Sequence, residues 1–153
     1  MRAENENWGD TVRNHLFDQR SAVMVHWLIL LNVVIFILGF FFQVDIPRNI
    51  YPPVHLDLIQ LYGAYSEYTC FHEGELWRLL TYQFLHAHLG HIMFNMIALW
   101  FFGPVVEERF GHWRFLLYYL FCGVAAALFS SLLGYMGFFD PEWRFIPMVG
   151  ASG

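Results

Sequence analysis

Three histidines and an asparagine lie within the ten residues of the segment HAHLGHIMFN, which runs from His86 to Asn95. His91 and Asn95 are four residues apart, so a helix would place both on one face, about one turn or ~6 Å apart. His86 stands just upstream, where such a helix should begin. The residues that follow are strongly apolar, and polar groups that enter hydrocarbon are costly. The pair therefore indicates a functional site inside a membrane.

A candidate nucleophile stands in the segment Gly150-Ala151-Ser152-Gly153. The string is short and weak evidence when taken alone. Its glycines permit a tight turn and close approach of a substrate. It follows an apolar segment and would open a helix, whose N-terminus points free N–H groups at a developing oxyanion. A nucleophilic serine also needs a base, and the histidines present are candidates only by elimination. His91 and Asn95 suit the role of oxyanion donors better, a role worth roughly 3–4 kcal/mol for each well-placed donor.

Two other interpretations of the histidines remain open. His86, His88 and His91, with His72 and Glu73, could supply ligands to zinc. Against this, the H-E-x-x-H spacing is absent and no acidic residue lies within the 86–95 segment. The histidines could also be structural, each with a hydrogen-bond partner inside a helical bundle, and this suits His88 best.

The composition indicates a membrane protein, because 58% of the 153 residues are hydrophobic and only 14% are charged, whereas soluble domains carry roughly 25%. The net charge of −5 and the absence of a basic cluster make nucleic acid an unsuitable partner. Cys70 and Cys122 form no framework, so we expect no structural disulfide. The polar, acidic start of the chain does not resemble a cleaved signal peptide, and nothing in the sequence calls for a metal or organic cofactor.

The site must be positioned by an all-α integral membrane bundle. We predict a polar leader over 1–20 and a membrane domain over 23–153. The predicted spans are 23–42, 89–106 and 113–133, and the predicted loops are 43–88 and 134–151. The first loop is amphipathic and should hold short helices at the interface, whereas the second should return into the membrane.

Several details follow from local chemistry. Trp77-Arg78 is typical of an interface anchor, with the indole in the headgroups and the guanidinium outside. The second span should stop at the charged group that begins with Glu107, and Asn32 should bond to a neighbouring helix. Ser130 and Ser131 should bond to carbonyls of their own helix.

The arginine distribution weakly favours a cytoplasmic N-terminus, in a plasma or inner membrane. With that orientation the two sides hold five and three arginines, namely Arg2, Arg13, Arg20, Arg109 and Arg114 against Arg48, Arg78 and Arg144.

At these residues the chain resembles the rhomboid family of intramembrane serine proteases, from about Leu58 to Gly153. The matching elements come in the family's order: Trp77-Arg78, His86, His91 and Asn95, Glu107, Arg109 and Gly111, and Gly150-Ala151-Ser152-Gly153. The resemblance implies that Ser152 is the nucleophile and that His91, Asn95 and the N–H of Ser152 bind the oxyanion. It further implies that His86 orders the first loop and the second helix, that Trp77 and Arg78 anchor that loop, and that Glu107 and Arg109 tie the cytoplasmic helix ends.

The family places its catalytic base, a histidine, on the sixth transmembrane helix, and this sequence carries three of the six core helices. We therefore expect a base beyond Gly153 and no cleavage of a transmembrane substrate by the 153-residue chain alone. The expected partners are transmembrane protein substrates and the lipid bilayer. Alternatives are a non-catalytic binder of membrane clients, disfavoured by Ala151-Ser152, and a histidine-lined ion or metal carrier.

Overall fold

A computed structural model describes residues 22–43 and 57–150, so the polar leader and Ser152 lie outside the described residues. Within them the elements are α2 Val23–Phe41, α3 Leu58–Gly63, α4 Glu67–Phe71, α5 Arg78–Thr81, η2 Tyr82–Phe84, α6 Leu89–Phe110, α7 His112–Tyr135 and η3 Pro141–Phe145. The prediction of an all-helical membrane protein is confirmed. In this part of the chain three helices, α2, α6 and α7, are long and apolar enough to cross a membrane.

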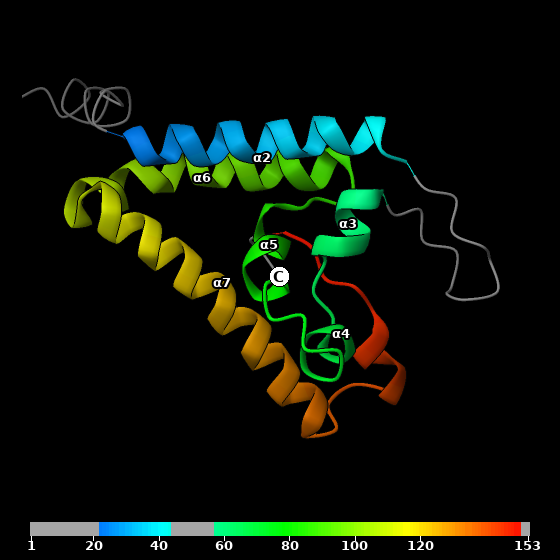
Figure 1. Ribbon diagram of the computed structural model, residues 1–153. Helices are drawn as coiled ribbons and strands as arrows, with labels where there is room; N and C mark the ends of the chain where they lie inside the picture. The colour runs from blue at the N-terminus through cyan, green and yellow to red at the C-terminus, as the bar shows by residue number, and fades with distance from the viewer. Residues whose placement is uncertain (1–21, 44–56, 151–153) are drawn as a thin grey trace, which may run out of the picture.

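Helices α2 and α6 lie side by side and run in opposite directions, while α7 leaves the end of α6 at a steep angle (Figure 1). The short helices of the first loop fill the wedge between α6 and α7. The segment after η3, residues 146–150 and drawn in red, passes back through this wedge to a position beside α5 (Figure 1). Together with η3 it forms the returning segment. The described parts of both predicted loops therefore pack between α6 and α7.

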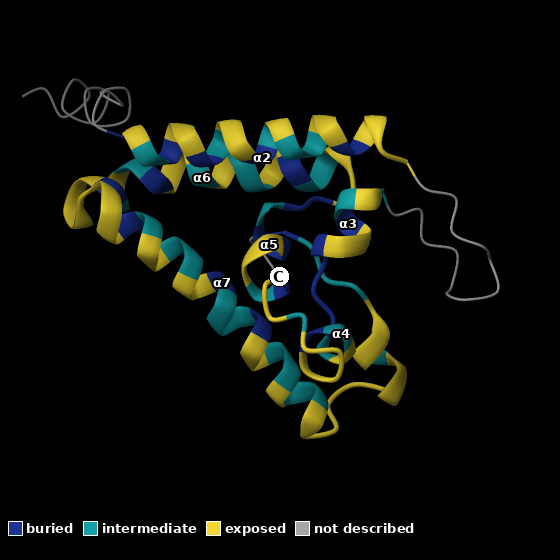
Figure 2. Ribbon diagram, viewed as in Figure 1, coloured by how far each residue is buried: buried dark blue, intermediate teal, exposed yellow. Residues whose placement is uncertain are grey.

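The long helices expose apolar side chains on their outer faces (Figure 2). In the most apolar 18-residue stretch of each helix, only 22% of α2, 17% of α6 and 11% of α7 is buried. A helix that is apolar all round and yet exposed is stable only where hydrocarbon covers it.

The prediction ends the second span at about Val106, whereas the helix α6 continues through Pro104 and past Glu107 to Phe110. The helix ends at Gly111, whose φ of 78° is favourable only for glycine. The end of an apolar run is thus not the end of the helix. The other spans, at Val23–Phe41 and His112–Tyr135, differ from the predicted 23–42 and 113–133 by one or two residues at their ends.

Glu107 is 1% exposed and caps the N-terminus of α2. Its two carboxylate oxygens accept hydrogen bonds from the backbone N–H groups of Met24 and Val25, each at 2.8 Å. It also pairs with Nδ1 of His112. The N-cap residue of α2 makes no side-chain cap, so α6 supplies the anion that the positive helix end requires. Arg109 lies exposed on the same turn.

The two serines of α7 bond outside their own helix, contrary to the prediction. Ser131 Oγ bonds to the hydroxyl of Tyr65, and Ser130 Oγ donates to Sδ of Met148 at 3.7 Å. The amide of Asn32 donates to the carbonyl of Leu28 in its own helix at 2.7 Å, and its side chain also faces Tyr119 of the neighbouring helix α7, as predicted. Which of two available partners a hydroxyl or amide takes depends on the loops packed beside it.

Candidate active site

Helix α6 begins at the predicted cluster. Its N-cap is His88, whose Nδ1 accepts a hydrogen bond from the backbone N–H of His91 at 3.1 Å. The side chain of Asn95 donates to Nε2 of His86 at 3.0 Å. The rings of His86 and His91 meet edge to face with centroids 5.0 Å apart. The structure therefore brings His86, His91 and Asn95 together, and it makes His88 the cap of the helix that carries them.

Gly150 reaches the same place from the other end of the chain. A Cβ added to it would lie 2.6 Å from both Cε1 and Nε2 of His91 and 3.4 Å from Nδ2 of Asn95. Its φ is +100°, a conformation that L side chains rarely adopt. Both facts favour glycine at this position, because a side chain would collide with the His91 imidazole and would also strain the backbone at this φ. The backbone two residues before Ser152 thus lies against His91 and Asn95, while Ser152 and Gly153 themselves lie outside the described residues.

The returning segment is held by backbone hydrogen bonds to the first loop. Tyr65 and Met148 form an antiparallel bridge, with N–H to carbonyl distances of 3.0 Å and 2.6 Å. The N–H of Gly150 donates to the carbonyl of Tyr82 at 2.8 Å. Tyr65 and Tyr82 are fully buried and pack with Cys70. The first loop therefore holds the returning segment in place as far as Gly150.

Two buried side chains of the first loop, His86 and Tyr82, are neutral at neutral pH. Burial, with a smaller effect from neighbouring His91, lowers the pKa of His86 to about 4. A neutral ring suits the acceptor role that Nε2 plays toward Asn95. Burial likewise raises the pKa of Tyr82 to about 12. The hydroxyl of Tyr82 therefore remains protonated and donates to the carbonyl of Gly123 in α7 at 2.7 Å.

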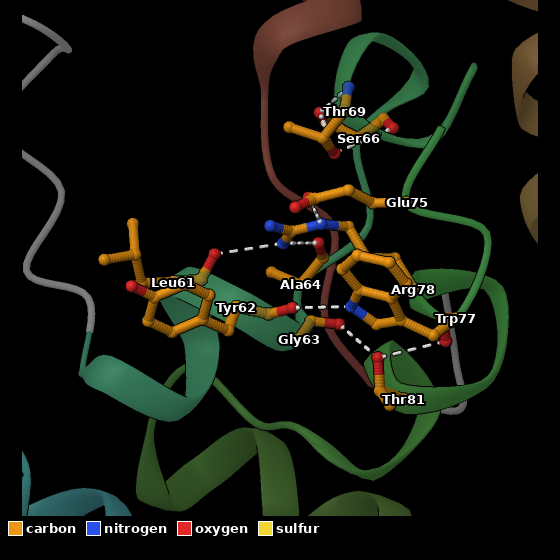
Figure 3. A network of polar contacts seen from close by, with 10 residues as sticks. All are labelled: Leu61, Tyr62, Gly63, Ala64, Ser66, Thr69, Glu75, Trp77, Arg78 and Thr81. Atoms are coloured by element: carbon orange, nitrogen blue, oxygen red, sulfur yellow. Dashed lines mark hydrogen bonds and ion pairs between the residues drawn. The ribbon is translucent and has the colours of Figure 1, made fainter. Parts of the chain in front are cut away.

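Arg78 is buried within the first loop, whereas the anchor pattern predicted a guanidinium exposed outside the headgroups. Its side chain is almost completely buried and Nη1 donates to the carbonyls of Leu61 and Ala64 at 3.0 Å and 2.7 Å (Figure 3). Nε pairs with the carboxylate of Glu75. Leu61 is in the last turn of α3, whose carbonyls lack partners within the helix. Arg78 therefore satisfies backbone groups that would otherwise be unpaired in a partly buried loop.

Trp77 contributes at the same helix end. Its indole N–H donates to the carbonyl of Tyr62 at 3.2 Å while about half of the side chain, 52%, stays exposed (Figure 3). Gln60, which sequence reasoning missed, donates from Nε2 to the carbonyl of His86 at 3.0 Å. The only available signal was an amide within the otherwise apolar run LIQLYG. Together these bonds join α3 to the start of the cluster.

The part of the chain that the structure describes contains no ligand set for a metal ion. No three His, Cys, Asp or Glu side chains there gather closely enough to hold an ion. His72, one of the suggested ligands, instead contacts Arg144.

Three helices long and apolar enough to cross a membrane, with Gly150 set against His91 and beside Asn95 on the second of them, describe a class of membrane protein, and the sequence comparisons identify its family. A family model described as the rhomboid domain matches residues 73–153, and the chain belongs to the rhomboid family. No solved structure matches.

Three relatives illustrate the range of the family. Rhomboid protease GluP of Bacillus subtilis is 40% identical over 92 residues, covering 60% of this chain and 16% of that protein. Rhomboid protease AarA of Providencia stuartii is 28% identical over 157 residues, covering 99% of this chain and 53% of that protein. Inactive RHOMBOID-like protein 8 of Arabidopsis thaliana is 38% identical over 58 residues, covering 38% of this chain and 16% of that protein. The chain thus spans about half the length of these relatives or less.

Proposed function

We propose that the protein is an intramembrane serine endopeptidase that cleaves peptide bonds in or near transmembrane segments of membrane proteins. One observation carries the proposal: Gly150, two residues before Ser152, contacts the His91 imidazole and lies beside the Asn95 amide. A nucleophile that follows this glycine would attack a carbonyl within reach of two side-chain donors. The apolar outer faces of the helices suit substrates that arrive from the bilayer.

The mechanism proceeds through an acyl-enzyme. Ser152 Oγ attacks the scissile carbonyl, and the resulting oxyanion accepts hydrogen bonds from His91, Asn95 and the backbone N–H of Ser152. The Asn95 amide carries two N–H groups, and His86 accepts one of them at 3.0 Å. This bond orients the amide and leaves its second N–H for the oxyanion. Collapse of the tetrahedral intermediate releases the amine product, and water then hydrolyses the acyl ester.

The base stays a prediction. We propose that a histidine beyond Gly153 takes the proton of Ser152, and that the 153-residue chain alone does not cleave a transmembrane substrate. The lowered pKa of His86 makes it a poor proton acceptor at neutral pH, and it already accepts from Asn95. We also propose a cytoplasmic N-terminus in a plasma or inner membrane, with Glu107 and Arg109 at the cytoplasmic side.

The test uses the protein as its gene encodes it, reconstituted in liposomes with a single-span membrane substrate. Ser152→Ala is expected to abolish cleavage and labelling by a fluorophosphonate. Asn95→Ala is expected to lower kcat by roughly 100-fold or more, the usual cost of one oxyanion donor. Cleavage that persists at the wild-type rate in Ser152→Ala would overturn the proposal.

A second candidate function is non-catalytic binding of membrane clients. One relative carries the name Inactive RHOMBOID-like protein 8, so a sequence similar to this chain can be described as inactive. This function predicts that the substrate co-purifies equally well with the wild-type protein and with Ser152→Ala, and that fluorophosphonate labels neither. The contact of Gly150 with His91 favours the protease.

A further inference from the structure

The returning segment has a second attachment to the first loop, on the exposed side of the bridge at Tyr65. Arg144 in η3 donates from Nε and Nη2 to the two carboxylate oxygens of Glu67 in α4, at 2.6 Å and 3.2 Å. Nη2 also donates to Nε2 of His72 at 2.7 Å. The ring of Tyr68 packs on Phe145, with centroids 4.9 Å apart.

One side of this attachment lies outside the residues that the family model matches, and the other side, Arg144, lies inside them. Glu67 and His72 precede residue 73, where that match begins. The Arg78–Glu75 pair lies within the first loop, whereas Arg144 joins that loop to a segment 77 residues later in the chain. The contacts of Arg144 are to side chains, so they do not serve to satisfy a buried helix end as those of Arg78 do.

The attachment lies a few residues from the Tyr65–Met148 bridge along both segments. Glu67 follows Tyr65 by two residues, and Arg144 precedes Met148 by four. Tyr65 and Met148 form the bridge, and two residues later Gly150 meets His91. The bridge fixes the distance between the two segments, and a contact to one side of it fixes how far the returning segment can pivot about the bridge.

We propose that Glu67 and Arg144, with His72 as an added acceptor, are positioning residues that set the segment ending at Gly150 against His91 and Asn95, just ahead of Ser152 in the sequence. The inference rests on the proposed function. A single exposed ion pair adds little to stability, and the Arg144 side chain is 47% exposed. A carboxylate held by two guanidinium nitrogens nevertheless restricts orientation, because both hydrogen bonds require one relative geometry. The effect therefore falls on the rate of the chemical step more than on folding.

The experiment compares Glu67→Gln, Arg144→Gln and the charge swap Glu67→Arg/Arg144→Glu in the full-length protein. Matched controls are Glu73→Gln and Glu142→Gln, which neutralise exposed acids on the same two segments. Each single variant of the Glu67–Arg144 pair is expected to lose roughly threefold to tenfold in kcat and in the rate of fluorophosphonate labelling, with KM within about twofold. The swap restores most of the lost rate. The final extent of labelling measures the folded fraction, so a rate that falls at constant extent reports position and not unfolding.

The inference is overturned if the single variants match the two controls, or if they lose only labelling extent. It is also overturned if the swap is as slow as the singles. Ser152→Ala, run in parallel, separates the two levels. If that variant still cleaves, the proposed function is wrong. If it is inactive while the variants of Glu67 and Arg144 behave like the controls, only the positioning role is wrong.

Discussion

Replacement of Gly150 by alanine tests the contact on which the proposed function depends. The new Cβ would lie 2.6 Å from two atoms of the His91 ring, where ordinary contacts are 3.4–4 Å. Either the imidazole or the backbone before Ser152 must move by about 1 Å to relieve the overlap. A displacement of this size between a nucleophile and its oxyanion donor lowers the rate by roughly 100-fold, which corresponds to about 2.7 kcal/mol.

Backbone strain contributes separately, and the chain offers a control for it. Alanine at the φ of +100° costs roughly 1–2 kcal/mol of folding free energy whatever the space around it. Gly137 lies in the same loop with a φ of +83°, and a Cβ there meets nothing within 4 Å. Gly137→Ala therefore carries similar strain without the collision with His91.

The assay measures kcat in liposomes together with the free energy of unfolding for both variants. We expect Gly137→Ala to lose stability but to keep its rate within about threefold of wild type, and Gly150→Ala to lose both. Equal rates for the two alanine variants would refute the reasoning, because the collision with His91 would then have no effect on catalysis.

Two further predictions concern stability. Glu107→Gln should lower the free energy of unfolding by about 2–3 kcal/mol, because the amide oxygen replaces only one of the two carboxylate acceptors at the start of α2 and carries no charge. The matched control is Glu108→Gln at the exposed neighbouring position, whose free energy of unfolding should stay within about 0.5 kcal/mol of wild type. Equal losses in the two variants would contradict the capping role. The pKa of His86 is about 4 in the folded protein against an ordinary 6.5, so only the unfolded state binds the proton between these values. Stability should therefore be complete above pH 6.5 and fall by up to about 3 kcal/mol toward pH 4, and this slope should largely vanish in His86→Asn when unfolding is followed against pH.

The site was partly predictable because its two halves obey local rules. The four-residue spacing of His91 and Asn95 predicts a shared helical face wherever the helix packs. The glycine before Ser152 predicts a tight approach, and the structure shows that approach at Gly150. The partners of these residues were not predictable from spacing, because the carbonyl of Tyr82 and the ring of His91 lie far from Gly150 in sequence.

The sequence by itself determined the membrane class, the three long helices and the pair on α6, since composition and periodicity act over one or two turns. Only the tertiary structure decided where polar groups find partners in a low-dielectric interior. Arg78 turns inward because the carboxylate of Glu75 and the carbonyls of Leu61 and Ala64 together offset the cost of burying its guanidinium. Glu107 lies under α2 for the same reason, since the nearest unsatisfied N–H groups belong to another helix.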